Sequence, residues 1–151
     1  MKNLLIATAA LAALAAPAFA EGDVAKGEKA FKKCKSCHMI KADDGTMIVK
    51  GGKTGPNLYG IVGKPLGSVE GYKYGKSIVA AGEAGIVWDE AGLAAYVADP
   101  KGYLKEVTGD SKAKSKMTFK LKKGGEDVAA YLASLAPAPA EEEAEAAASD
   151  S

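Results

Sequence analysis

One short segment constrains this chain more than any other. Cys34-Lys35-Ser36-Cys37-His38 contains both cysteines and the only histidine of the 151 residues. Thiols at this spacing lie about one helical turn apart, so each can bond to one of the two vinyl groups of a haem, and the next residue is held against the iron. C-x-x-C-H is the attachment motif of haem c. The segment predicts one covalent haem c, attached at Cys34 and Cys37, with His38 as an axial iron ligand.

Three other interpretations of this segment have to be weighed. A redox-active C-x-x-C disulfide belongs beside a βαβ unit, and the sequence pattern contains none. A structural zinc site takes four ligands, so two cysteines and one histidine would need a carboxylate to complete it. A plain structural disulfide leaves His38 without a role. Haem attachment uses both cysteines and the histidine, and it is the favoured interpretation.

The other side of the iron needs a second ligand if the site only changes its oxidation state. No second histidine exists, so a methionine sulfur is the expected donor. Met39 adjoins His38 and cannot cross to the opposite face, and Met47 lies in the loop that first passes the histidine side. Isolated methionines usually fill core space, but Met117 is far enough along the chain to approach from the opposite side. His/Met ligation raises the reduction potential relative to two nitrogen ligands.

The chain divides into three parts. Residues 1–20 combine Lys2, an apolar run and the small-residue pattern Ala18-Phe19-Ala20, which is typical of a cleaved signal peptide. Residues 21–136 are expected to form one domain, and residues 137–151 an acidic, Ala/Pro-rich disordered tail. We therefore expect an exported protein in the periplasm. The alternative is a tethered protein that keeps the first segment as a membrane anchor.

The central domain is basic. Residues 21–136 hold 19 lysines against 14 acidic residues, and the chain has no arginine. Export and the lack of arginine, which makes bidentate contacts to bases and phosphates, argue against nucleic acid. Many lysines instead flank the candidate ligands, where they predict a docking surface for acidic proteins. These are Lys32, Lys33, Lys35 and Lys53 near the cysteines, and Lys112, Lys114, Lys116, Lys120, Lys122 and Lys123 around Met117. Lys73 and Lys76 are expected away from this surface.

The hydrophobic pattern predicts an all-α fold with long loops. Helices are expected over residues 24–31 with Asp23 as the cap, 74–81, 90–98 with Asp89 as the cap, and about 125–135. Gly82 is expected to close the second helix, and Asp99-Pro100 to start a short turn. The lysine-rich residues 105–123 are expected to be irregular, and no strand of convincing length is visible. Ala and Gly dominate the domain and large apolar side chains are few, which suggests that a bound group fills its centre.

With these features in place, the chain resembles the class I c-type cytochromes, most closely the bacterial cytochrome c2 and c-550 type. The resemblance covers nearly all of residues 22–135. Beyond C-x-x-C-H it rests on Lys53-Thr54-Gly55-Pro56-Asn57-Leu58-Tyr59-Gly60, Trp88, Tyr96, Asp99-Pro100-Lys101, Lys116-Met117-Thr118-Phe119 and Asp127-Val128-Ala129-Ala130-Tyr131-Leu132. It implies a monomer with the class I cytochrome c fold, in which about four to five helices and long loops surround one haem.

The resemblance also implies roles for single residues. The Pro56 carbonyl should accept the Nδ1 proton of His38. Tyr74 and Trp88 should donate to a buried haem propionate, and Tyr96 should form a hydrogen bond near the sulfur of Met117. Related proteins often place an arginine by the propionate where this chain has a lysine, Lys64.

The implied function is electron transport without enzymatic activity. Partners would be acidic surfaces of redox proteins in a respiratory or photosynthetic chain. The donor would be of the cytochrome bc type, and the acceptor a terminal oxidase, a reductase or a photosynthetic reaction centre. The alternative is a haem peroxidase or a protein that binds small ligands. That activity requires an open iron position and a distal acid-base group, and no second histidine is present to serve as one.

Overall fold

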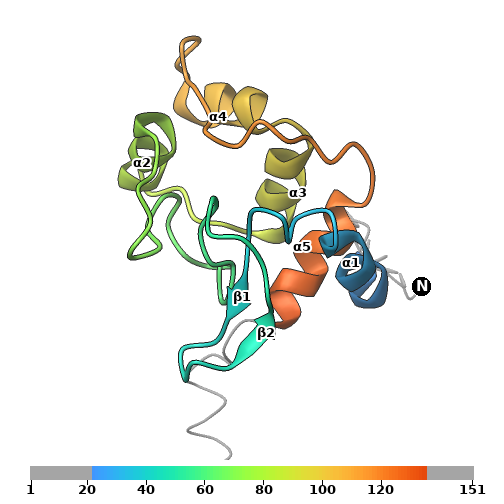
Figure 1. The fold of residues 1–151 in the computed structure, drawn as a ribbon. Coiled ribbons are helices and arrows are strands. Elements are labelled where there is room, and N and C mark those ends of the chain that lie inside the picture. The colour runs from blue at the N-terminus through green and yellow to red at the C-terminus, as the bar shows by residue number, and fades with distance from the viewer. Residues whose placement is uncertain (1–21, 136–151) are drawn as a thin grey trace, which may run out of the picture.

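A computed structural model describes residues 22–135 of the chain (Figure 1). The predicted signal peptide and the acidic tail lie outside the described residues. The elements of the described part are α1 (Val24–Phe31), β1 (Ile40–Lys41), β2 (Met47–Val49), α2 (Lys76–Glu83), α3 (Glu90–Ala98), α4 (Pro100–Thr108) and α5 (Gly125–Ser134). The predominantly helical fold with long loops is confirmed. None of these helices is long and apolar enough to cross a membrane.

The first and last helices cross and hold the two ends of the domain together (Figure 1). Asp23 begins α1 by accepting a hydrogen bond from the backbone of Lys26, as its position predicted. The Asp23 backbone N–H in turn donates to the side chain of Asp127 at 2.8 Å. Inside the crossing, the rings of Phe31 and Tyr131 pack with their centroids 5.8 Å apart. The segment that follows α1 is thereby directed into the centre of the domain.

The two strands form a short ribbon that the sequence pattern did not predict. Strand β1 pairs antiparallel with β2, with Ile40 opposite Val49. The hairpin is closed by a bond from the Ala42 N–H to the Thr46 carbonyl at 2.9 Å. Strands of two and three residues are too short to show a two-residue alternation, which is why the pattern missed them. Ile40 is fully buried and anchors the ribbon to the core.

Helix α2 begins and ends two residues later than predicted, because Gly82 does not close it. Gly82 lies inside the helix, where a Cβ atom would sit only 2.0 Å from the carbonyl oxygen of Leu66. Glycine is needed there for the close approach of two backbone segments. The closing residue is Gly85, whose φ of +88° is left-handed and whose N–H bonds to the Gly82 carbonyl at 2.9 Å.

Helix α4 is a full helix where the sequence predicted a short turn and an irregular segment. Asp99 caps it by accepting from the Gly102 N–H at 3.2 Å, and Pro100 occupies the first position. Residues 105–108, predicted to be irregular, are helical. Only Pro100 and Leu104 are buried in this helix, so its apolar stripe is too sparse to stand out among the lysines. Helix α3 begins after Asp89, as predicted.

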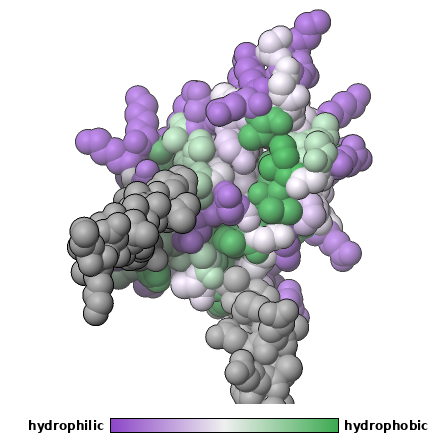
Figure 2. All heavy atoms as spheres, turned by 180° about the vertical axis from the view of Figure 1, so that it is seen from behind, coloured by the Kyte–Doolittle hydropathy of each residue, from purple (hydrophilic) through white to green (hydrophobic). Residues whose placement is uncertain are grey.

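The surface is mainly hydrophilic. Figure 2 shows hydrophilic side chains projecting around the molecule, with a smaller group of apolar residues between them. The large apolar side chains that are exposed in residues 22–135 are Val24, Met47, Ile48, Val87 and Phe119. Phe119 follows the candidate iron ligand Met117 by two positions and belongs to the site described next.

Candidate functional site

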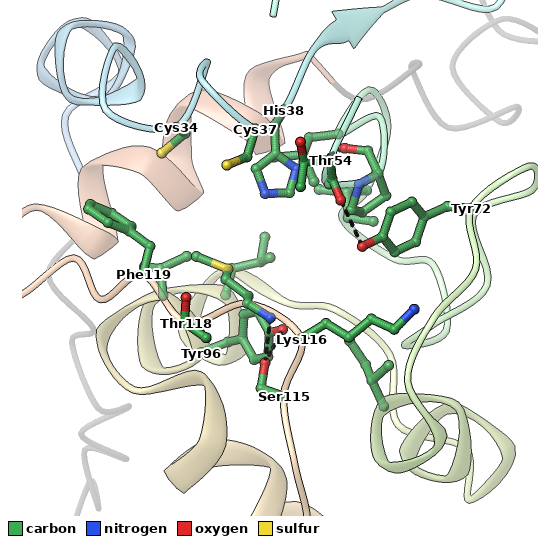
Figure 3. A pocket seen from close by; sticks show the side chains of 18 of the residues that line it. Cys34, Cys37, His38, Thr54, Tyr72, Tyr96, Ser115, Lys116, Thr118 and Phe119 are labelled. Atoms are coloured by element: carbon green, nitrogen blue, oxygen red, sulfur yellow. Dashed lines mark hydrogen bonds between the residues drawn. The ribbon is translucent and has the colours of Figure 1, made fainter. Parts of the chain in front are cut away.

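The predicted ligands of the haem line one cavity of about 320 Å³. Cys34, Cys37 and His38 reach it from the segment after α1, and Met117 from the segment before α5. Figure 3 shows the motif residues on one wall and residues 115–119 on the facing wall. Residues almost 80 positions apart are thus brought to the two sides of one space, as Met117 ligation requires.

The rest of the lining is largely apolar. It includes Phe31, Leu58, Ile61, Ile78, Leu93, Leu104, Val128 and Leu132. Protein cores are close-packed, and voids larger than a water molecule are few. A cavity of about 320 Å³ between core side chains therefore fits a large apolar group. The donors on its walls, two thiols, an imidazole and a thioether, match a covalently attached haem.

The loop that follows the motif controls the orientation of His38. The Nδ1 atom of His38 donates to the carbonyl oxygen of Pro56 at 2.8 Å, the bond that the resemblance implied. Burial lowers the pKa of His38, and this hydrogen bond partly opposes the shift. The imidazole is therefore neutral at pH 7 with its proton on Nδ1, which leaves the lone pair of Nε2 for a metal.

Gly55 permits the close packing of this loop on the imidazole. A Cβ atom at Gly55 would lie 2.3 Å from Cε1 of His38, which is too close for any side chain at this position. The Gly55 N–H also donates to the carbonyl of Cys37 at 2.8 Å, which ties the loop to the motif itself. The backbone at residue 55 therefore forms one side of the histidine pocket.

Asn57 is a positioning residue that the sequence analysis missed. Its side-chain oxygen accepts from the Lys41 N–H at 2.9 Å, and its amide nitrogen donates to the Lys41 carbonyl at 2.7 Å. The same oxygen accepts from the Tyr59 N–H at 3.2 Å. Asn57 thus fastens the Pro56 loop to the strand that follows His38. Its place directly after Pro56, with one donor and one acceptor in the same side chain, was the available signal.

The cysteines do not have the properties of a redox-active disulfide. Burial, followed by the proximity of Cys37, raises the pKa of the Cys34 thiol to about 11. A thiol that attacks disulfides has a lowered pKa. The zinc alternative lacks its fourth ligand, since residues 22–135 contain no cluster of three or more His, Cys, Asp or Glu suited to a metal ion.

The Met117 side of the cavity differs in one detail from the expectation. The Tyr96 hydroxyl was expected to bond near the Met117 sulfur, but its partner is the hydroxyl of Ser115 at 3.1 Å. Ser115 also accepts the backbone N–H of Met117 at 3.1 Å. Tyr96 therefore acts on the backbone of Met117 through Ser115, which the sequence analysis did not single out.

Tyr74 and Trp88 both line the cavity, where the propionate role requires them. Burial raises the pKa of Tyr74 to about 12, so its hydroxyl remains a donor at neutral pH. Trp88 is buried against Tyr96, with ring centroids 5.0 Å apart. The Lys64 carbonyl accepts the Trp88 backbone N–H at 2.9 Å, so Lys64 contacts this residue through its backbone.

The two groups of lysines meet beside the cavity. Lys33, Lys114 and Lys116 line the cavity itself. Lys33 also lines a shallow depression next to it, together with Phe119, Lys120, Leu121, Lys122 and Lys123. Lys32, Lys35, Lys53 and Lys112 are exposed but line neither space.

Two lysines differ from their expected surroundings. The ammonium of Lys120 pairs with Asp99 at 2.9 Å, so part of its charge is already compensated. Lys73 was expected to lie away from the site, but its carbonyl oxygen accepts a hydrogen bond from the Lys116 ammonium. Lys73 is therefore beside the site, because the loop before α2 folds against the Met117 segment.

Comparison with known proteins identifies relatives of the whole domain. The chain is 60% identical to cytochrome c-550 of Paracoccus versutus over 140 residues, which cover 91% of each chain. It is 62% identical to cytochrome c2 of Rhodobacter capsulatus over 133 residues, 88% of this chain and 96% of the relative. The crystal structure of ferric cytochrome c-550 from Paracoccus versutus superposes with a TM-score of 0.75 at 62% identity and covers 78% of this chain and all of that one. No protein-family model matches the chain.

The fold and the site define a small haem protein of the class I c type. The chain belongs to the cytochrome c family, among the cytochromes c2 and c-550. It carries one covalent haem c and transports electrons between redox partners. The peroxidase and small-ligand alternatives find no support in these relatives.

Proposed function

We propose that Cys34 and Cys37 hold the haem through thioether bonds and that His38 and Met117 are its axial ligands. The observation that carries this assignment is that the motif residues and the Met117 segment face each other across one apolar cavity (Figure 3). When bound, the haem iron supplies the redox chemistry, taking up one electron on reduction and releasing it on oxidation.

The chain's own residues hold His38 and Met117 in fixed positions while the charge of the site changes. The Pro56 carbonyl fixes the tautomer of His38 and makes it a stronger donor. Ser115 holds the backbone of Met117 from the other side. The apolar walls keep water away, which favours the less charged ferrous state and raises the reduction potential. With both axial positions taken by side chains, no position is left for a substrate, and we assign no catalytic residue.

The partners we propose are acidic surfaces of redox proteins. Support comes from the lysines that border the cavity, since clustered positive charge speeds encounter with an acidic surface. A cytochrome bc-type complex is the proposed donor, and an oxidase, a reductase or a photosynthetic reaction centre the proposed acceptor. The protein would work as a monomer in the periplasm, after cleavage behind Ala20. Mass spectrometry of the purified protein checks the cleavage, because a chain that begins at Met1 would instead support the tethered alternative.

The ligand assignment is tested by absorption spectroscopy of two methionine variants. The ferric wild-type protein should show the weak sulfur-to-iron charge-transfer band. Met117→Ala should lose this band, have a lower reduction potential and, when ferrous, bind carbon monoxide. Met47→Ala is the matched control, because Met47 is exposed on β2, and it should keep the band. Loss of the band in Met47→Ala but not in Met117→Ala would show that the assignment is wrong.

A further inference from the structure

The shallow depression beside the cavity gathers positive charge near the beginning of α5. Lys33 reaches it from the segment after α1, and Lys120, Lys122 and Lys123 reach it from the segment that leads into α5. Within the described part of the chain, Lys120 alone of these four has an ion-pair partner, Asp99. Because like charges close together repel one another, the three other lysines favour a negatively charged occupant of the depression.

The chain contains such an occupant beyond its last helix. Residues 141–151 hold four glutamates and one aspartate, and no lysine. The spacer Ala136-Pro137-Ala138-Pro139-Ala140 separates this acidic segment from Leu135, the last residue that the structure describes. The depression and the acidic segment are therefore complementary in charge.

The spacer also has the length that their contact requires. Helix α5 has 10 residues, and at 1.5 Å per residue it is about 15 Å long. The depression lies beside its beginning, and the acidic segment follows its end. A proline-rich spacer extends by about 3.1 Å per residue, so these five residues span about 15 Å. The first glutamates therefore reach the lysines if the spacer runs back along the helix.

We propose that the acidic segment, residues 141–151, binds back onto the lysines of the depression and competes there with negatively charged redox partners. The contact is intramolecular, so a short linker gives the segment a high effective concentration at any concentration of the protein. Exposed ion pairs are weak, each contributing a factor of about 1.4 to 5 to an equilibrium, so a partner with a larger acidic surface displaces the segment. The competition rests on the docking surface proposed above, whereas the intramolecular contact does not.

This competition has a characteristic dependence on salt. At an ionic strength of about 0.01 M charges act over about 30 Å, and at about 1 M over only about 3 Å. The acidic segment should therefore shield the lysines at low ionic strength and leave them at high ionic strength. Neutralising the segment should speed the reaction with an anionic redox partner about two- to fivefold at low ionic strength, and hardly at all at high ionic strength.

The contact itself is tested without a partner, by NMR spectroscopy of the reduced holoprotein. The test variant keeps the length of the chain and removes four charges: Glu141→Gln/Glu142→Gln/Glu143→Gln/Glu145→Gln. The backbone amide signals of Lys33 and of residues 119–123 should differ between this variant and the wild type at low ionic strength, and the differences should vanish at high ionic strength. The matched control removes the same charge from exposed side chains outside the depression and should leave these signals in place: Asp43→Asn/Glu83→Gln/Glu90→Gln/Glu106→Gln.

The competition is tested by stopped-flow oxidation of the reduced protein with hexacyanoferrate(III), an anion that takes up one electron from the protein and becomes hexacyanoferrate(II). The test variant should react about two- to fivefold faster than the matched control at low ionic strength. Both variants carry the same net charge, so a difference between them reports where the charge was removed. Adding Lys122→Gln/Lys123→Gln should abolish this difference, because the segment then loses its binding site.

Three results would count against the proposal in different ways. Amide signals that do not change at the depression, or that change only around other lysines such as Lys41 and Lys50, would overturn the contact. Equal oxidation rates of the test variant and the matched control would overturn the competition. If the signals change as expected but Lys33→Glu does not slow association with an acidic protein, the docking surface proposed above fails while the contact stands, so the two failures are distinguishable.

Discussion

The Nδ1 atom of His38 lies 2.8 Å from the carbonyl oxygen of Pro56, on a loop that also bonds to the chain segment around this histidine. Gly55, directly before this proline, bonds to Cys37, and Asn57, directly after it, bonds twice to Lys41. The carbonyl that orients the histidine is thus held on both sides by the chain segment that contains the histidine. The orientation of the proposed ligand and the folding of this loop are therefore coupled.

Asn57→Ala should weaken this coupling. It removes the three hydrogen bonds of the side chain, and we expect the free energy of unfolding to fall by about 1 to 3 kcal/mol. The reduction potential should rise, because a less well oriented Pro56 carbonyl makes His38 a weaker donor to ferric iron. Urea unfolding and voltammetry of the holoprotein measure both. Asn57→Asp keeps the hydrogen-bond acceptor but not the donor, so its free energy of unfolding and its reduction potential should lie between those of the wild type and Asn57→Ala. Wild-type values of both quantities in Asn57→Ala would contradict the positioning role.

Gly55→Ala should displace the histidine or the loop. The added Cβ would lie 2.3 Å from Cε1 of His38, and overpacking of this kind costs about 1 to 3 kcal/mol. The wild-type holoprotein is the reference for this comparison. Thermal melting of the two holoproteins compares them. Equal melting temperatures would mean that the loop accommodates the added methyl group without a loss of stability.

The domain should not fold without its haem. An empty apolar cavity costs about 24 cal/mol per Å³, so the cavity of about 320 Å³ would cost on the order of 8 kcal/mol. That is as much as the whole stability of a typical small domain. The double variant Cys34→Ala/Cys37→Ala, prepared without haem, should show little helical circular dichroism. A cooperative melting transition in this apoprotein would refute the prediction.

Charge reversal of the lysines beside the cavity should slow association with an acidic redox partner. Lys33→Glu and Lys122→Glu should have larger effects than Lys101→Glu on the exposed side of α4, and all effects should shrink as salt rises. Lys120→Glu should matter less than Lys122→Glu, because Asp99 already compensates Lys120. Lys73 is unsuitable as a distant control, since it contacts Lys116. Stopped-flow kinetics over a salt series measures the association rates. Equal effects of all four substitutions on these rates would mean that only the net charge counts.

Features that depend on neighbours in sequence were predicted well. Asp23 and Asp89 cap helices at the positions expected, because a cap requires only a side chain and the next turn of backbone. The prediction that Gly82 closes α2 was wrong because its role depends on a residue distant in sequence. Its role is set by the carbonyl of Leu66, a contact that no local pattern reveals. The short ribbon at Ile40 and the helical residues 105–108 were missed because their apolar patterns are too brief.

The sequence by itself determined the chemistry of this protein. Cys34, Cys37 and His38 lie within five residues, so their spacing alone predicts that two thiols and an imidazole bind one haem. Tertiary structure decided how the rest of the site is assembled. The pairing of Tyr96 with Ser115 and the approach of Lys116 to Tyr72 join segments 19 to 44 residues apart, and the packing of the helices sets these distances. Local covalent geometry carries the first kind of information, whereas the second exists only once the chain has folded around the cavity.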